Sequence, residues 1–319
     1  MTLKSKVNIW SYLIRFTAVY ILTVLAVTVL FILVKNAIPA ESRVALDFFE
    51  PYKLGFSETV VIAIRGLVIA LVLYPFYDLI VRHSVGVRYL FAALWGLVLF
   101  ASMEPAPGTI EGFIYTKTTI PEHLLVMAAA ALQVAIFCKL YLYLEKVYGQ
   151  QVLTVAGRPG RPESVRHGFF VGNGYLFRFA IMHLLVYIAV GSLFYQVAGY
   201  EEALASMEEF TLWRDLESMG MVAAVFFGQV FRGLFIAIMV APFYESYLKK
   251  RSGWFLLFAL LFGLKVLVIL IQVPELPIKW SELIIGIPEI TVQTFVFSIL
   301  FFGWERRRER KRLTAAVQQ

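Results

Sequence analysis

Two arginines lie inside long apolar segments, where a charged side chain is costly. Arg65 and Arg232 open two fourteen-residue segments, 65–78 and 232–245, which share eight identical positions without gaps. An arginine at the centre of a membrane-spanning helix costs about 2.5–3.5 kcal/mol on insertion scales. Turned toward the protein interior, the two guanidinium groups would act as twin donors for an anionic group. The alternatives are that each snorkels to the outer headgroups or forms a purely structural ion pair.

The second half of the chain carries deep polar side chains that the first half lacks. Lys265 stands near the middle of an apolar segment where the first half has Val98, and His183 replaces Tyr20. A lysine at that depth needs a partner, a cavity or water, whereas a histidine there can also be a satisfied core residue. We therefore expect a polar site specialised in the second half, with the following substrate-binding residues: Arg65, Arg232, Lys265, His183 and Gln229.

Two glutamates follow prolines at the expected outer starts of helices. Glu122 and Glu289 each end an Ile-Pro-Glu sequence, and proline in a first turn beside a carboxylate is typical of a helix N-terminus. The alternative is a duplicated ion pair, Arg65 with Glu122 and Arg232 with Glu289, because all four charges are expected in the outer half of the membrane. The acidic residues expected as ion-pair or structural partners are Glu122, Glu289, Glu104 and Glu111, the last two as further candidates for Arg65.

The sequence contains no recognisable catalytic or metal-binding motif. A GxSxG elbow, an HExxH zinc motif, a P-loop and a cluster of acidic metal ligands are all missing. Cys138 is the only cysteine, which rules out an intramolecular disulfide, and the four histidines are too scattered for a metal or haem site. We therefore expect no catalytic residue, no metal and no cofactor.

The composition indicates that a bilayer is the solvent of this chain. Hydrophobic residues make up 60% of its 319 residues, charged residues 16%, and the mean hydropathy is +0.76. Because a helix needs about 20 apolar residues to cross the hydrocarbon core, the sequence predicts an all-α polytopic membrane protein with about eight transmembrane helices. They are expected near 9–34, 57–81, 85–103, 121–147, 173–198, 219–248, 253–273 and 284–304. The first is longer than the roughly 7–15 apolar residues of a signal peptide, so we expect it to be retained.

Positive charges concentrate in alternate loops. Basic residues precede the first span and recur near 82–88, near 158–166, at 249–251 and in the tail at 306–312. The positive-inside rule then puts both termini in the cytoplasm, and the protein in the inner membrane if it is bacterial. This distribution accounts for the net charge of +7 without a nucleic-acid partner.

Four sequence matches in one order indicate a tandem duplication. Besides the arginine segments, the matching pairs are 12–16 with 175–179, 91–97 with 258–264, and 120–122 with 287–289. Four helices per copy is an even number, so both copies enter the membrane from the same side, in parallel orientation about an axis along the membrane normal. The predicted divisions are a first four-helix repeat at 1–148, a cytoplasmic linker at 149–172, a second four-helix repeat at 173–305 and a basic cytoplasmic tail at 306–319.

Small residues spaced four apart recur in both copies. Such faces let helix backbones approach closely, so packing explains most of the repeated residues but not the charges. Pro75 and Pro242 are expected to kink their helices near the cytoplasmic end. The expected helix-packing positions are Gly66, Ala70, Gly233, Ala237, Ala92, Gly96, Ala259 and Gly263.

These features favour an integral membrane transporter or lipid-handling protein with a buried cationic site for an anionic small molecule or lipid headgroup. The first alternative is a non-catalytic structural or assembly subunit of a membrane complex, because small-residue packing needs no substrate. The second is an intramembrane enzyme without a recognisable motif. Membrane lipids and an anionic small molecule are the expected partners, with a membrane-protein partner or a homo-oligomer as open alternatives.

Overall fold

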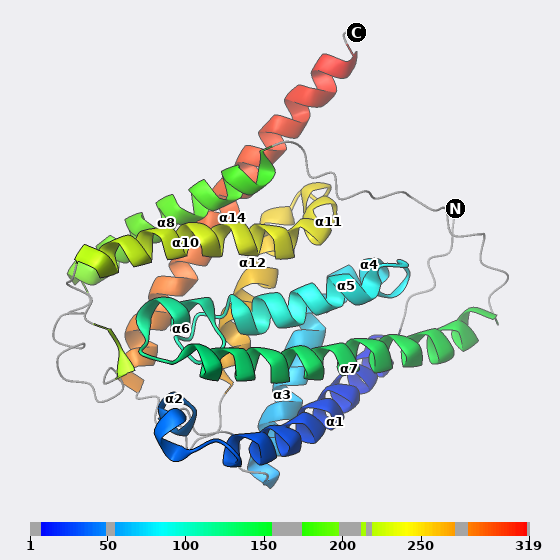
Figure 1. The fold of residues 1–319 in the computed structure, drawn as a ribbon. Helices are drawn as coiled ribbons and strands as arrows, with labels where there is room; N and C mark the ends of the chain where they lie inside the picture. Colours follow the sequence, from blue (N-terminus) through cyan, green and yellow to red (C-terminus); the bar gives the residue numbers. More distant parts are fainter. Residues whose placement is uncertain are drawn as a thin grey trace.

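The chain is a multi-pass helical membrane protein by the length and composition of its helices. The computed structural model describes residues 8–48, 55–154, 174–197, 212–214, 219–271 and 280–317 (Figure 1). Within these residues, seven helical segments are long and apolar enough to cross a membrane. Four of them are single helices: α1 (Ile9–Asn36), α7 (Ile120–Thr154), α8 (Tyr175–Val197) and α14 (Trp280–Val317). Three are interrupted: α3 (Phe56–Leu73) with α4 (Tyr77–Val81), α10 (Met219–Val240) with α11 (Tyr244–Leu248), and α12 (Gly253–Phe262) with α13 (Val268–Leu270).

The expected span at 85–103 is a shorter helix. It consists of α5 (Gly86–Phe91) and the π-helical segment η3 (Ala92–Phe100). At about 1.5 Å per residue it is roughly 22 Å long, less than the roughly 30 Å of the hydrocarbon core. Leu90, Ala93 and Leu97 on this helix are completely buried, because neighbouring helices enclose it. The expected eighth full-length span is therefore absent from the part of the chain that the structure describes.

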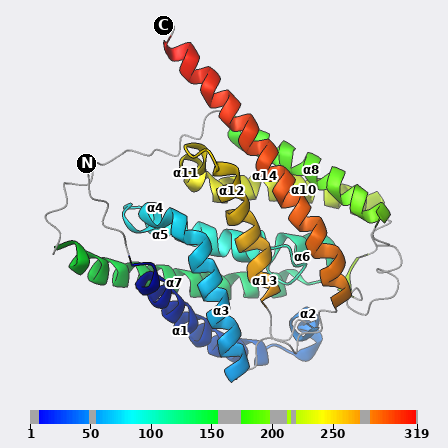
Figure 2. The ribbon, with the colours of Figure 1, turned by 180° about the vertical axis from the view of Figure 1, so that it is seen from behind.

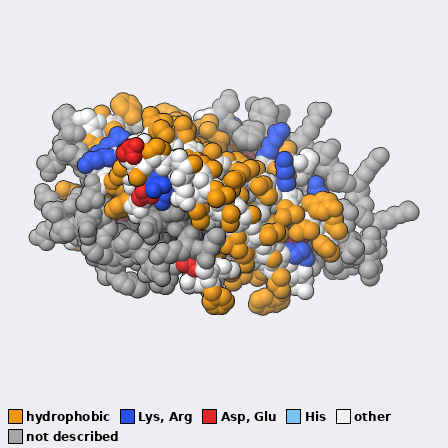
Figure 3. Space-filling model, turned by 60° about the horizontal axis from the view of Figure 1, so that its bottom comes forward, with side chains coloured by type: hydrophobic (Ala, Val, Ile, Leu, Met, Phe, Trp, Pro, Cys, Tyr) orange, Lys and Arg blue, Asp and Glu red, His pale blue; other side chains and the backbone are white. Residues whose placement is uncertain are grey.

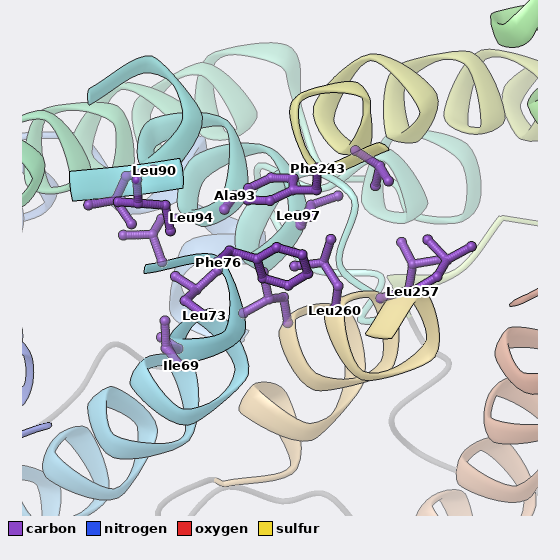
Figure 4. Close-up of a cluster of buried hydrophobic side chains, with 14 of the residues drawn as sticks. Ile69, Leu73, Phe76, Leu90, Ala93, Leu94, Leu97, Phe243, Leu257 and Leu260 are labelled. Carbon is purple, nitrogen blue, oxygen red and sulfur yellow. The ribbon is translucent and has the colours of Figure 1, made fainter. Parts of the chain in front are cut away.

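The two expected proline kinks are 3₁₀ turns inside long helices. Pro75 lies in η2 (Tyr74–Phe76), between α3 and α4, and Pro242 lies in η5 (Ala241–Phe243), between α10 and α11. A proline removes one helical hydrogen bond and clashes with the preceding turn, which explains both interruptions. The kinks bring Phe76 and Phe243 together edge to face, with ring centroids 5.0 Å apart. Figure 4 shows Phe76 between leucines of α5–η3 and leucines of α12.

The helix formed by α5 and η3 and the helix formed by α12 and α13 are called the inner helices. Each packs against a proline-kinked helix of the other half of the chain. Gly96 in η3 faces Met239 of α10, and Gly263 in the second π-helical segment, η6 (Gly263–Leu267), faces Val72 of α3. A Cβ atom on either glycine would overlap the facing side chain. The backbones can therefore approach at these crossings only because the residues are glycines.

Two of the alanines expected to pack helices also accept hydrogen bonds. The Tyr12 hydroxyl of α1 donates to the Ala70 carbonyl of α3 at 2.8 Å, and the Tyr175 hydroxyl of α8 donates to the Ala237 carbonyl of α10 at 3.3 Å. These bonds join the first two helices of each half. The other expected packing positions are buried or half-buried: Gly66, Gly233, Ala92 and Ala259.

Two arginines at the ends of helices form ion pairs. Arg15 Nε of α1 lies 2.8 Å from Glu145 of α7, and Arg178 Nε of α8 lies 2.5 Å from Glu305 of α14. Both carboxylates are buried, and each accepts a further hydrogen bond from the tyrosine that follows a proline kink.

The outer surface matches a lipid environment. Large apolar side chains are exposed on α1, α3, α7, α8, α10 and α14. In the face drawn in Figure 3, hydrophobic side chains cover the middle, Lys and Arg gather at one end, and mixed charges lie at the other. The C-terminal part of α14 projects beyond the other helices (Figure 2). α7 continues to Thr154, into the expected linker at 149–172, most of which lies outside the described residues.

The two glycine crossings should differ in their tolerance of a methyl group. Gly263→Ala is expected to lower the free energy of unfolding by about 1–3 kcal/mol, because the β-branched Val72 side chain has little rotamer freedom. Gly96→Ala should lower it by less than about 1 kcal/mol, because the flexible Met239 thioether can move away. Denaturant unfolding of both variants in one detergent measures the difference, and equal losses would contradict this packing.

Candidate functional site

A buried ion pair joins the two halves of the chain. Arg232 of α10 is 5% exposed, and its Nη1 donates to Glu111 of α6 (Ile110–Tyr115), the short helix after η3. Its Nη2 donates to the backbone carbonyls of Ala101 at 3.3 Å and Ser102 at 3.0 Å, where η3 ends. The last carbonyls of a helix have no intrahelical donor and carry a partial negative charge. One guanidinium therefore neutralises a carboxylate and caps a helix of the other half.

Gln229 and Lys265 lie next to this ion pair. Gln229, almost one turn before Arg232, is completely buried, and its Nε2 lies 3.3 and 3.4 Å from the two Glu111 carboxylate oxygens. Lys265 of η6 is 7% exposed, and its backbone carbonyl accepts a hydrogen bond from Met103. Arg232 and Glu111 are the charged groups that act on the Lys265 ammonium electrostatically. Within the described residues, the ammonium itself has no hydrogen bond and no ion pair.

Side chains from α8 and α6 complete the cluster. His183 of α8 lies against Gly233 and close to Lys265, Arg232 and Gln229. Nearby, the hydroxyls of Tyr115 and Tyr187 lie 2.5 Å apart, joining α6 to α8. Burial raises the pKa of Tyr115, so this phenol is neutral at ordinary pH. We call Glu111, Gln229, Arg232, Lys265 and His183 the polar cluster.

Several buried atoms of the polar cluster have no hydrogen-bond partner among the residues that the structure describes. They are Gln229 Oε1, Arg232 Nε and His183 Nε2, although the Gln229 amide lies close enough to His183 and Tyr115 to act on both side chains. Most buried polar atoms in proteins are partnered, because an unpaired one loses its hydration without compensation. Together with the Lys265 ammonium, these atoms leave hydrogen-bonding capacity in the cluster for a bound polar ligand.

Arg65 does not join this cluster. It lies half-buried on α3, and its Nε donates to the backbone carbonyl of Ile271, directly after α13, at 2.5 Å. Glu104 acts on it electrostatically; burial raises the pKa of that carboxyl, and the guanidinium opposes the rise. Arg65 and Arg232 therefore bind the ends of two different helices. The expectation that both donate to one shared anion is not met in this structure.

The structure corrects the expected partner of Glu122. One carboxylate oxygen accepts from the backbone nitrogens of Ala45 and Leu46 in α2 (Val44–Phe48), at 2.8 and 3.1 Å. The other accepts from the Thr119 nitrogen at 2.9 Å and hydroxyl at 2.8 Å, immediately before α7. The bond from the Thr119 nitrogen is the one that the glutamate of a capping box accepts. The helix-start interpretation therefore describes Glu122, and a pair with Arg65 is wrong.

Glu289 lies elsewhere than expected. α14 begins at Trp280, so Pro288 stands inside this helix rather than in its first turn. Gln293 Nε2 donates to Glu289 at 2.8 Å, and the carboxylate lies near Gly191 of α8. Arg232 is paired with Glu111 instead, so both the helix-start interpretation of Glu289 and its ion pair with Arg232 are wrong.

The short helix that carries Glu111 is fixed by contacts on two sides. The His123 ring of α7 stacks on Phe113 at 3.7 Å, and its Nδ1 accepts from the Gly108 nitrogen. On the other side, residues 212–214 make backbone hydrogen bonds with 115–117, and Trp213 stacks on Tyr115. Sequence reasoning did not anticipate this helix, because six residues are too few for a periodic pattern. The available signal was an acidic residue within an apolar and aromatic segment.

Neither a metal site in the described residues nor a known relative indicates a function for this chain. Within the described residues, no group of three or more His, Cys, Asp or Glu side chains is arranged to hold a metal ion. In comparisons with known proteins, no family model, no curated protein and no solved structure matches this chain. The function proposed below is therefore inferred from the geometry of the polar cluster.

The ion pair should be strongly coupled energetically. Arg232→Leu and Glu111→Leu should each cost about 3–5 kcal/mol, because each leaves a buried charge unpaired. The double variant should lose less than the sum of the two single losses. Unfolding of all four proteins in one detergent gives the coupling energy, and additive losses would show that the pair does not form.

Proposed function

We propose that the chain is a tandem duplication of a four-helix unit, with repeats at 1–148 and 173–305, the linker at 149–172 and the tail at 306–319. Support comes from contacts that recur in both halves: the tyrosine-to-carbonyl bonds, the arginine–glutamate pairs and the proline kinks. The glycine crossings are reciprocal, because Gly96 and Gly263 are separated by 167 residues, as are Val72 and Met239.

The recurring contacts also revise the alignment of the last helices. Phe16 packs on Phe137 at 4.8 Å, and Phe179 packs on Phe297 at 4.7 Å. The offset of this match is 297 − 137 = 160, and the pair Glu145 and Glu305 has the same offset. The Ile-Pro-Glu match has an offset of 167, two helical turns away. On this alignment the counterpart of Glu122 is position 282, which explains why Glu289 has a different role.

In the proposed orientation, both repeats run in the same direction and the symmetry axis stands along the membrane normal, near Phe76 and Phe243. Both termini then lie in the cytoplasm. The gathering of Lys and Arg at one end of the face drawn in Figure 3 agrees with a cytoplasmic end there. For a bacterial chain this is the inner membrane.

The orientation can be tested with reporter fusions. A fluorescent protein that folds only in the cytoplasm should be bright when fused after Gln319, and alkaline phosphatase fused there should be inactive. The pattern should reverse for fusions after Asn36, at the end of α1. Active phosphatase after Gln319 would refute the proposed orientation.

We propose that the protein is a transporter or lipid-handling protein that binds an anionic group at the polar cluster. The observation that carries this proposal is the buried Lys265 ammonium beside an ion pair that already satisfies Glu111. An ammonium buried without a counter-charge is strongly unfavourable, and intramembrane lysines therefore mark binding sites or pathways. An anion bound at Lys265 would remove that cost.

Comparison of the two halves argues that these polar groups are not needed for folding. The counterparts of His183, Gln229 and Lys265 in the first half are Tyr20, Ile62 and Val98. The first half therefore makes its helix contacts without them. A group that costs folding energy and has an apolar counterpart in the same architecture is better explained by ligand binding.

A structural or assembly subunit is the second candidate. The observation that favours it is that Arg65 and Arg232 both cap helices of the other half, a role that needs no ligand. This role explains the two arginines, but it does not explain why a lysine is buried at position 265.

Substitution of Lys265 by the residue of the first half separates the two candidates. Lys265→Val should fold at least as well as the native protein, because it removes an unpaired buried charge, and it should lose stabilisation by anions. The matched control is Lys139→Val, at an exposed lysine of α7. Thermal unfolding in detergent with carboxylates, phosphate and anionic lipids measures both effects. Absence of anion stabilisation in the native protein would favour the structural role.

A further inference from the structure

We propose that Glu111 sets the valence of the bound anion, so that the polar cluster selects a singly charged oxyanion over a doubly charged one. This inference rests on the proposed function, since it concerns the ligand of the same site. It follows from the balance of charges at the cluster and from the way in which Glu111 is held.

The polar cluster carries one net positive charge when Lys265 is protonated. Arg232 and a protonated Lys265 contribute two positive charges, and Glu111 contributes one negative charge. The other groups facing them are the side chains of Gln229, Tyr115 and His183. At pH 8, above the ordinary histidine pKa of about 6.5, these three side chains add no charge. The sum is one positive charge, which a monoanion cancels. A dianion would leave one excess negative charge beside Glu111, in surroundings where charges interact far more strongly than in water.

Glu111 is a fixed member of the cluster rather than a group that a ligand readily displaces. It is bound by Arg232 and by the Gln229 amide. Thr109 caps the N-terminus of the helix that carries it, and the Thr109 hydroxyl accepts from the Gly112 nitrogen at 2.8 Å. The contacts of this helix with His123 and Trp213 hold it from both sides. A ligand therefore meets Glu111 as a resident negative charge.

The ligand chemistry implied is a carboxylate or a singly ionised phosphodiester. Either oxyanion accepts charge-assisted hydrogen bonds from an ammonium and from a guanidinium nitrogen. Among the described residues, Arg232 Nε has no hydrogen-bond partner, and the Lys265 ammonium makes no hydrogen bond or ion pair. A carboxylate can come from a small molecule, and a phosphodiester from a lipid headgroup. Phosphomonoesters and sulfate carry more charge at neutral pH and should bind less well.

The test compares probes of different charge on the full-length protein in detergent. The small-molecule arm uses benzoate and sulfate, read out by thermal stabilisation. The lipid arm uses phosphatidylglycerol and phosphatidic acid, read out by native mass spectrometry. Both are run at about pH 8, above the ordinary pKa of histidine, about 6.5. The native protein should prefer the monoanion about tenfold or more in at least one arm, and that arm identifies the source of the ligand.

The decisive variant is Glu111→Gln, which raises the net charge of the cluster to two. Its preference should shift toward the dianion by about tenfold or more, since one negative charge has been removed. The matched control is Glu104→Gln, a carboxylate beside Arg65 and outside the cluster, which should keep the native preference. If Glu111→Gln does not fold, Lys265→Gln decides, because a cluster of zero net charge should no longer bind the monoanion.

The outcomes separate this inference from the proposed function. If no probe binds the native protein, the proposed function fails and this inference fails with it. If anions bind but the dianion is preferred, or if Glu111→Gln keeps the native preference, only the role of Glu111 is overturned. Persistent monoanion binding by Lys265→Gln would overturn it as well.

Discussion

The cost of burying charge in a medium without water governs how the two halves of this protein fit together. Arg232 has its positive charge balanced by Glu111 and its donors satisfied by the carbonyls at the end of η3. Both sets of partners come from the other half, so the ion pair forms only when the halves are assembled. The π-helical inner helices and their glycine crossings bring the backbones close enough for this contact.

The two intramembrane arginines show how one motif can acquire two roles. Each reaches across to carbonyls at the end of an inner helix, Arg65 to Ile271 and Arg232 to Ala101 and Ser102. This shared contact supplies donors to carbonyls at helix ends, which have no donor within their own helix. Around Arg232 the structure describes a gathering of further polar side chains, namely Gln229, Lys265 and His183. The proposed binding site is thus an elaboration of a structural contact.

Hydropathy predicted where the long helices lie, because crossing a bilayer needs a long apolar run that is visible in the sequence. The proline kinks also followed from residue type. Depth along a helix, however, does not tell which way a side chain points, so the partners of Arg65, Arg15 and Arg178 could not be predicted. Glu111 was one candidate among several, since its helix is too short to show a period. The Ile-Pro-Glu match predicted one role for Glu122 and Glu289, whose contacts differ, because three residues are a weak guide to structural equivalence.

An experimental map of the protein in lipid nanodiscs tests anion binding at Lys265 most directly. It should show density for an oxyanion within about 2.7–3.2 Å of Lys265 Nζ, with Glu111 still bound to Arg232. A map in which the Lys265 ammonium is paired with a carboxylate of the protein, or reaches bulk water, and in which no such density lies beside it, would contradict anion binding at this site.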